Sequence, residues 1–398
     1  MSGRTSLPGE LVPVTVPLSF TLDGTNRPAY ANNSLAIRRS NLVVYWLLFA
    51  FFALGASIEQ PFRMQGKSTL ILTAGAIVLA ALIGLRYGVG SDWVPYAAMY
   101  RRAGILSLES VLRQTDPGYQ LLNWSVQQVG LGLWAVNIIC GTIFSWGLLR
   151  FCRNQPLPWL AFAAAISYLG IVVAMGYTRQ AVALGIILAG LAAVEKGASG
   201  LRFATYVAVA ALFHRTAVMV LPLVAFSSER TRLLNFLVAV AVVVLAYDLF
   251  LSSSLTWFFS LYLDTEMSSQ GAAIRVALVT IPAVVFLFNR KRFDFPVRED
   301  RIWRNFALAA LVALVALFTV RSTTAVDRVS LYLLPLEIVI LARIPLAFRS
   351  PIFAKLAVIA LSGAILSVWM TFAVNAQYWL PYRLFPIGER INLTTRPH

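Results

Sequence analysis

The sequence has few of the residues that enzymes use for metal or redox chemistry. It contains two cysteines and two histidines in 398 residues, and no HExxH, CxxC, GxGxxG or complete P-loop pattern occurs in it. Because Cys140 and Cys152 lie in or near one apolar segment, neither a disulfide framework nor a metal cluster is indicated. The missing motifs leave zinc, P-loop and dinucleotide chemistry without support. We therefore expect no cofactor, no bound metal and no nucleic-acid partner.

Charge is also scarce. Only 13% of the residues are charged and 59% are hydrophobic, with a mean hydropathy of +0.74. A soluble protein carries roughly 25% charged residues. The composition therefore predicts a polytopic membrane protein of the all-α class, a bundle of transmembrane helices.

Among the basic residues, lysine is rare. Only four of the 33 are lysines, and all bases together outnumber 17 acidic residues. Arginine keeps its charge at depth in a membrane and binds carboxylate or phosphate through two parallel hydrogen bonds. The arginines are either cytoplasmic orientation signals in a GC-rich genome or the binding groups for a strongly anionic substrate.

The hydropathy pattern predicts about 11–12 transmembrane segments, each of which needs ~20 mostly apolar residues. Residues 1–40 are expected to be a polar flexible tail, residues 41–374 the transmembrane domain, and residues 375–398 a polar C-terminal tail. The apolar stretches are 42–58, 68–85, 120–149, 157–178, 180–194, 201–226, 233–247, 276–289, 305–320, 329–342 and 356–382.

The stretch 201–226 is unusual because His214 and Arg215 stand at its centre. It is either one long helix with two ionisable groups buried midway or two half-helices that meet at a polar tip. Paired short segments can place helix ends and charge at a membrane site. We therefore expect broken or re-entrant helices in the bundle.

Short basic loops set the orientation. The loop 289–304 has six basic residues and is predicted to be cytoplasmic. If 201–226 enters the membrane and returns, the segment 86–119, Arg179, the His214 tip, the loop 251–273 and residues 321–328 are outside. If 201–226 crosses once, everything before it is inverted.

Residues 86–119 form the longest polar interruption, and they are dense in paired charge, tyrosine, glycine and proline. Long ordered loops are more often functional than incidental. Asp92 follows two glycines and either presents its carboxylate or caps the helix that begins near Pro95. Asp116 starts a turn and a helix at Pro117, or it contacts a sugar or an arginine.

Five short motifs resemble those of the EpsG-type polysaccharide polymerases, the Wzy-like membrane proteins of exopolysaccharide pathways. RYGVGSDW at 86–93 looks like RxGVGTDY, and DPGY at 116–119 like EPGY. MGYTRQ at 175–180 resembles an RQ element that opens a helix, and FHRTA at 213–217 resembles FHxSA. Asp327 and Arg328 with Tyr332 resemble a late Arg-plus-Tyr element. Ser91, Trp93, Asp116 and Arg215 depart from the family pattern.

The resemblance implies a membrane glycosyltransferase in the bacterial cytoplasmic (inner) membrane. Because no DxD motif or cluster of carboxylates in a metal-ligand pattern occurs, we expect the transferase to be independent of metal. It implies that a growing glycan is transferred from its undecaprenyl-pyrophosphate carrier onto the next lipid-linked repeat unit on the outer face. The implied partners are the undecaprenyl-pyrophosphate-linked oligosaccharide, membrane lipids, and the flippase and the chain-length and export proteins of a polysaccharide pathway.

Such a reaction needs cations for the leaving pyrophosphate and a base for the acceptor hydroxyl. Asp92 and His214 are the candidate bases, and the alternative for His214 is a structural core histidine. The candidate substrate-binding residues, whose alternative roles are internal ion pairs, structural turns and interfacial contacts, are Arg86, Asp116, Tyr119, Arg179, Gln180, Arg215, Arg321, Arg328 and Tyr332.

Two rival functions remain open at this stage. A transporter or flippase for lipid-linked oligosaccharide also has many spans, but it usually has two repeated halves, and the segment 86–119 has no counterpart in the C-terminal half. A ligase that moves finished polymer to another acceptor would use nearly the same chemistry. An acyltransferase is disfavoured because His214 has no acid beside it in the sequence.

Overall fold

The computed structural model describes residues 35–63, 66–225, 227, 271–320 and 323–387. Contacts divide the chain into Met1–Ser40 and Asn41–His398, and all described helices except the start of α1 belong to the second unit. The expected span 233–247, the expected outer loop 251–273 up to Gln270, and Arg321 lie outside the described residues.

The described residues form helices and no strand. Three 3-10 turns and one π-helical segment (η1) continue or interrupt α-helices, and one further 3-10 helix (η6) follows the last of them. In chain order the elements are α1 (Leu35–Ile58), α2 (Gly66–Gly84), α3 (Trp93–Ala103), α4 (Leu108–Leu112), α5 (Pro117–Gln128), α6 (Leu133–Cys152), α7 (Pro158–Ala165), η1 (Ile166–Val173), α8 (Ala174–Gly176), α9 (Thr178–Glu195), α10 (Gly200–Phe213), η2 (Arg215–Val220), α11 (Leu221–Ala225), α14 (Ala272–Asn289), η4 (Arg290–Arg292), α15 (Val297–Thr319), α16 (Thr323–Ser330), η5 (Leu331–Leu333), α17 (Leu334–Ala347), α18 (Pro351–Phe372) and η6 (Val374–Trp379).

Within the described part of the chain, eight helical segments are long and apolar enough to cross a membrane, and three shorter apolar helices accompany them. The prediction of an all-α polytopic membrane protein is therefore confirmed. Two predicted stretches are divided differently. The stretch 120–149 is broken at Gly130, which has φ +75, and the helix expected over 356–382 ends at Phe372.

Small residues allow the central helices to approach closely. A Cβ atom on Gly147 of α6 would lie 1.8 Å from the carbonyl oxygen of Gly185 on α9. In a membrane, where lipid is as apolar as leucine, such close backbone contact is a main source of helix association. Because nearly every residue of α9 is buried, the side chains at its first turn, including Arg179, are held on a rigid element.

The stretch 201–226 is a re-entrant hairpin. Helix α10 ends at Phe213, His214 has an extended backbone (φ −157, ψ 107), and η2 and α11 run back. Both ends of the hairpin meet α15, because Arg298 donates to the carbonyl of Ala198 at 2.6 Å and Asn305 to that of Leu223 at 2.9 Å. Of the two possibilities raised by the sequence, the structure therefore adopts the two half-segments with His214 at the tip.

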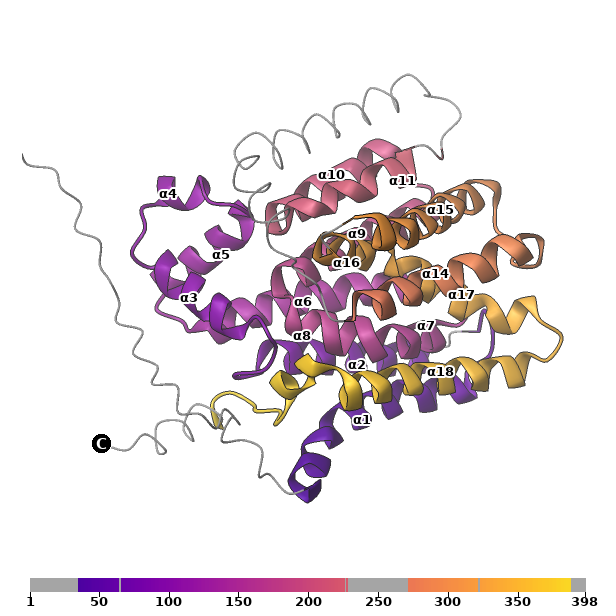
Figure 1. Ribbon diagram of the computed structural model, residues 1–398, viewed down its shortest axis with the longest axis horizontal. Helices are drawn as coiled ribbons and strands as arrows, with labels where there is room; N and C mark the ends of the chain where they lie inside the picture. Colours follow the sequence, from indigo (N-terminus) through magenta and orange to yellow (C-terminus); the bar gives the residue numbers. More distant parts are fainter. Residues whose placement is uncertain (1–34, 64–65, 226, 228–270, 321–322, 388–398) are drawn as a thin grey trace, which may run out of the picture. The chain divides into compact units, whose positions relative to one another are not determined.

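The bundle has two chemically different ends. We define the basic end by the connections near residues 59–63, 153–157, 195–200 and 289–304. They are joined by contacts such as Asn154 to Glu195 (3.0 Å) and Phe62 N to the carbonyl of Pro156 (3.0 Å). We define the loop end by residues 86–119, 177–179 and 214–215. Helices α3, α4 and α5 gather at this end (Figure 1).

The segment 86–119 is mostly helical. Ser107 caps α4 by accepting a hydrogen bond from the backbone N–H of Ser110 at 3.3 Å, and Pro117 occupies the first turn of α5, where its missing N–H costs nothing. Arg101 and Arg102 stand in the last turn of α3, where cations are favoured by the helix dipole. The polar segment is therefore a small helical layer.

Residues 374–387, which we call the C-terminal strap, pack against the start of this layer. Three backbone N–H groups are involved: Tyr87 N donates to Arg383 O (2.8 Å), Gly90 N to Tyr378 O (2.9 Å) and Phe385 N to Leu85 O (2.7 Å). Trp379 is buried beneath, and its indole N–H donates to the carbonyl of Ile171 in η1 at 3.0 Å. The strap thus joins the helical layer to the core.

Candidate functional site

Asp116 is the centre of a polar cluster at the loop end. It precedes α5 with a left-handed backbone (φ 57), a conformation that is costly for a non-glycine residue but better tolerated by aspartate. Its carboxylate does not cap α5. It accepts a hydrogen bond from Arg179 Nη1 at 2.6 Å and from the backbone N–H of Arg215 at 3.1 Å, and it lies 3.7 Å from His214 Nδ1. One buried carboxylate therefore joins three segments that are far apart in the sequence.

The environment separates the charge states of Asp116 and His214. Burial acts to raise the pKa of the Asp116 carboxyl, but His214, Arg179 and the N–H of Arg215 together hold it below its usual value. Burial lowers the pKa of His214, and the charges of Arg179 and Arg328 lower it further, while Asp116 opposes them. At neutral pH the pair is therefore a carboxylate beside a neutral imidazole. Among the residues that the structure describes, neither ring nitrogen of His214 has a hydrogen-bond partner.

Arg179 lies between Asp116 and a pair of tyrosines. Its guanidinium is 5.9 Å from the centre of the Tyr96 ring, and its Nε has no hydrogen-bond partner. Tyr119 packs against Tyr96 with ring centres 5.6 Å apart, and its buried hydroxyl is also without a partner. Arg179 is therefore anchored on one side and retains an unused donor on the other.

Three further predicted residues connect the hairpin and α9 to α16. Gln180 donates to the carbonyl of Arg328 at 2.7 Å, and the Arg328 guanidinium lies 4.8 Å from the centre of the Tyr177 ring. Tyr332 is buried and reaches the hairpin through Thr216, whose hydroxyl lies 3.4 Å from the Tyr332 hydroxyl. Gln180, Arg328 and Tyr332 are thus placed around the Asp116–His214 pair.

Arg86 lies beneath the cluster and not on its surface. Its side chain is 1% exposed. It donates to the carbonyls of Ile83 and Val89 and, at 2.7 Å, to the hydroxyl of Thr178 at the start of α9. With its donors directed at protein groups, Arg86 positions Thr178 and the turn after α2.

Asp92 is partly exposed at the start of α3, where its side chain makes no capping hydrogen bond. Ser91 donates to its carboxylate at 3.2 Å. Burial raises the pKa of Tyr96 and Tyr177, and the negative charge of Asp92 raises both further. Asp92 is therefore close enough to the cluster to act on it electrostatically, from the solvent side.

Sequence reasoning did not select Tyr96, Tyr177 or Arg275 as site residues. Arg275 forms a buried ion pair with Asp327. Each of these two charges stands at the edge of an apolar stretch, which is a costly place for an unpaired ion, and this signal could have suggested that they pair. Among the described residues, no three His, Cys, Asp or Glu side chains come together as a metal site would require.

The fold and the cluster define a multi-pass membrane protein with a buried polar site at one end of its helix bundle. The EpsG family model matches residues 69–384, which include every element of the cluster. The chain belongs to the EpsG family, a Wzy-like family of polysaccharide polymerases. No curated protein and no solved structure matches the chain.

Proposed function

We propose that the protein polymerises lipid-linked oligosaccharide repeat units into an exopolysaccharide or O-antigen-like polymer. In this reaction the growing glycan leaves its undecaprenyl-pyrophosphate carrier and is joined to the next lipid-linked unit. The observation that carries the proposal is the Asp116 cluster, because it sets a neutral, unpartnered imidazole beside several guanidinium groups. A base and an anion-binding group are what this transfer requires.

His214 is the base in this proposal. The acceptor hydroxyl gives its proton to a ring nitrogen of His214 as its oxygen bonds to the anomeric carbon of the donor. The bond between that carbon and the pyrophosphate oxygen breaks, and the carrier pyrophosphate leaves as an anion. Asp116 stays ionised and stabilises the imidazolium. Asp92 is the alternative base, acting from the exposed side of Tyr96 and Tyr177.

Arg179, Arg215 and Arg328 hold the leaving pyrophosphate in this proposal. The charges of Arg179 and Arg328 act on His214, and the backbone of Arg215 adjoins it; a cation is most effective when it is already in place as negative charge develops. Gln180 and Tyr332 orient Arg328 and the hairpin, and Arg86 supports Thr178 from below. Tyr119, which is buried against Tyr96, supports the position of Arg179. The predicted role of Arg321 remains a prediction.

The reaction is proposed to take place on the outer face of the cytoplasmic membrane. The six basic residues of 289–304 belong to the basic end, and basic loops are retained in the cytoplasm. The re-entrant hairpin brings both of its ends to this basic end and directs His214 to the other. The loop end is then the outer one.

The test is the lipid-linked glycan profile of a deletion strain, measured by extraction and mass spectrometry. The expected result is a single undecaprenyl-pyrophosphate repeat unit, accessible from the outer face, with no polymer. Long lipid-linked polymer that fails to reach its acceptor would instead assign a ligase. A repeat unit confined to the inner leaflet would assign a flippase and remove the catalytic role of His214.

A further inference from the structure

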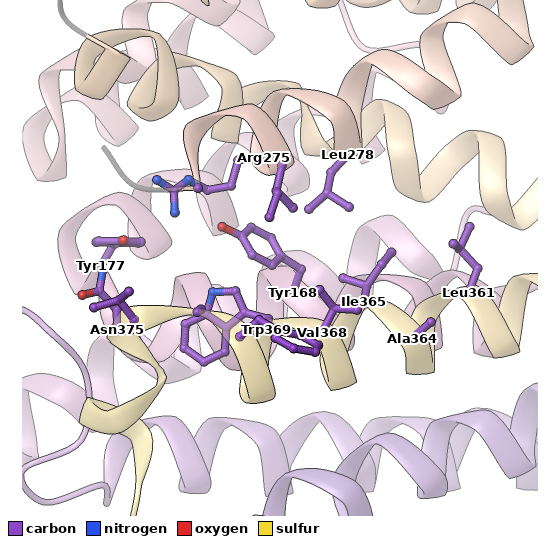
Figure 2. A pocket seen from close by; sticks show the side chains of 15 residues that line it. Tyr168, Tyr177, Arg275, Leu278, Leu361, Ala364, Ile365, Val368, Trp369 and Asn375 are labelled. Atoms are coloured by element: carbon purple, nitrogen blue, oxygen red, sulfur yellow. The ribbon is translucent and has the colours of Figure 1, made fainter. Parts of the chain in front are cut away.

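A cavity of about 370 Å³ lies beside the cluster, between α14 and α18, with Tyr168 of η1 at its floor. This volume is in the range of small-molecule binding sites. Its polar groups and its apolar groups are segregated. In Figure 2 Arg275, Tyr177 and Asn375 lie at one end, and Leu361 and Ala364 lie at the other. The cavity is therefore amphiphilic along its length.

The polar end adjoins the proposed catalytic groups. Tyr177, which lines it, is covered by the guanidinium of Arg328 at 4.8 Å and immediately precedes Thr178 and Arg179. Arg275, which also lines it, is paired with Asp327. Helix α9 begins at Thr178, and helix N-termini favour phosphate. An anionic head group at this end would lie beside Arg328 and the first turn of α9.

The apolar end runs along a transmembrane helix. The lining residues of α18 extend from Phe372 back to Leu361, a rise of about 16 Å at 1.5 Å per residue. Several of them also face outward: Leu361 is 48% exposed and Phe372 is 76% exposed. On a helix that spans a bilayer, exposed apolar side chains face lipid, so the cavity opens sideways to the hydrocarbon region.

We infer that this cavity holds the polyprenyl chain of a lipid-linked substrate, with its pyrophosphate at the Arg328 end. This inference rests on the proposed function and adds the place where the lipid part is bound. A carrier whose tail stays in the bilayer must enter from the side, and the cavity is open on that side. A single polyprenyl tail with an anionic head matches one apolar channel that ends at cations. A phospholipid would need room for a second chain.

The test uses full-length protein in nanodiscs of phosphatidylethanolamine and phosphatidylglycerol. Ala364→Trp fills the apolar end from α18, and Leu278→Trp fills it from α14. The matched control is Ala360→Trp, because Ala360 is an exposed alanine of α18 that does not line the cavity. Native mass spectrometry measures the affinity for undecaprenyl pyrophosphate and for a pyrophosphate on a two-isoprene chain.

For wild-type protein and for Ala360→Trp, the Kd for undecaprenyl pyrophosphate is expected to be lower than the Kd for the two-isoprene pyrophosphate by about tenfold or more. Either cavity-filling variant should abolish that preference and leave the affinity for the short chain unchanged. An undiminished preference in both folded variants would overturn the inference. The inference would also be overturned if added phosphatidylglycerol displaced the bound undecaprenyl pyrophosphate as readily as added undecaprenyl pyrophosphate does.

A polymerisation assay on the same samples separates this inference from the proposed function. If wild-type protein binds undecaprenyl pyrophosphate in an Ala364-dependent manner but forms no polymer, the proposed reaction is wrong and the lipid site stands. If it forms polymer and the variants retain their chain-length preference, the reaction stands and the lipid site is wrong.

Discussion

The carboxylates of Glu59 and Glu195 at the basic end and the side chains of His214 and Arg179 at the loop end differ in how their polar atoms are hydrogen-bonded. At the basic end the Glu59 carboxylate accepts hydrogen bonds from the backbone N–H groups of Trp159 and Leu160 at 3.0–3.2 Å. Glu195 there is bonded by the amides of Asn154 and Gln155 at 3.0 and 3.1 Å. At the loop end, by contrast, both ring nitrogens of His214 and the Nε of Arg179 are without a hydrogen-bond partner in the described part of the chain.

This difference separates two carboxylates that are bonded within the fold from two side chains that retain unbonded nitrogens in the described structure; unbonded polar atoms also occur at the basic end, on Gln155 and Trp303. A buried polar atom without a partner carries a desolvation cost of roughly 1–3 kcal/mol. Carboxylates at the basic end avoid that cost by bonding to protein donors, and this satisfies helix ends and fixes loops. The unbonded nitrogens of His214 and Arg179 at the loop end carry that cost.

The largest expected effect is at the hairpin tip. His214→Asn keeps a polar side chain of similar size but removes the base, so polymer formation should fall by about 10²–10⁴-fold, with the protein still present in the membrane. Polymer yield in a complemented deletion strain, normalised to membrane-inserted protein, measures it. The Asp92→Asn variant in the same strain tests the other candidate base. If Asp92→Asn lowers the polymer yield more than His214→Asn does, Asp92 is the base.

The next largest effect is expected from replacing the carboxylate of Asp116, with Asp300 at the basic end as the matched control. Asp116→Asn should lower the polymerisation rate by about 10²-fold, because it removes the charge that stabilises the imidazolium and anchors Arg179. Asp300→Asn, which breaks the ion pair of Asp300 with Arg290 at the basic end, should leave the rate within a factor of two to three.

The pH dependence of the polymerisation rate is a further test of the role of Asp116. Since burial lowers the pKa of His214, the acid limb of the wild-type rate should have its midpoint below the usual value of 6.5. Because an anionic neighbour favours the imidazolium, Asp116→Asn should move that limb to still lower pH. A limb that moves upward, or a profile that does not change, would contradict the positioning role of Asp116.

A smaller effect is expected for two stacked arginines. Arg328 lies over Tyr177 at 4.8 Å at the loop end, and Arg150 over Trp146 at 5.1 Å on α6. Arg328→Ala should raise KM for the lipid-linked donor by about tenfold through the loss of one charge-assisted contact. Arg150→Ala should leave KM unchanged. Similar KM values in the two variants would remove Arg328 from the substrate site.

The smallest effect on activity is expected at Glu59, where the change should appear in stability. Burial raises the pKa of Glu59 to about 7 from 4.5, against the opposing effects of its backbone hydrogen bonds and of Lys355. A raised pKa means that the folded state binds the extra proton, so the stability it adds is present below about pH 4.5 and is lost as the pH rises through 7.

Glu59→Gln should therefore flatten the pH dependence of thermal unfolding over this window, by up to about 3 kcal/mol at 1.36 kcal/mol per pKa unit, and should leave polymerisation unchanged. The measurement is Tm in detergent at pH 5 and pH 8. A wild-type Tm that rises between these values would contradict the sign.

Much of the fold could be predicted from the sequence, because spanning segments depend on local hydropathy. The break at His214 could be anticipated for the same reason, since two ionisable residues interrupt an apolar run. The turn at Gly130 and the end of α18 were not predicted, because both lie in stretches without a charged residue, and the nearby polar residues, such as Gln127 and Asn375, are uncharged. In those stretches tertiary contacts decide where a helix ends.

The site was only partly predictable. Motif order placed Asp116, Arg179 and His214 in one protein, but the 3.7 Å approach of Asp116 to His214 depends on three segments packing together. The local sequence around His214 therefore gave no indication that an acid, Asp116, lies beside it. Arg86 illustrates the reverse case. Its type and position suggested ligand binding, whereas its burial and its bond to Thr178 depend on the turn at Val89 and on the C-terminal strap.

The strap also affects when the protein becomes functional. Residues 378–385 supply the hydrogen-bond partners of residues 85–90, and Trp379 packs against the helix that leads to Tyr177. During synthesis the early segment enters the membrane long before residue 385 leaves the ribosome. The loop end is therefore completed only after residues 378–385 have been made, and until then the inserted chain lacks the support that holds Arg86 and the start of α3.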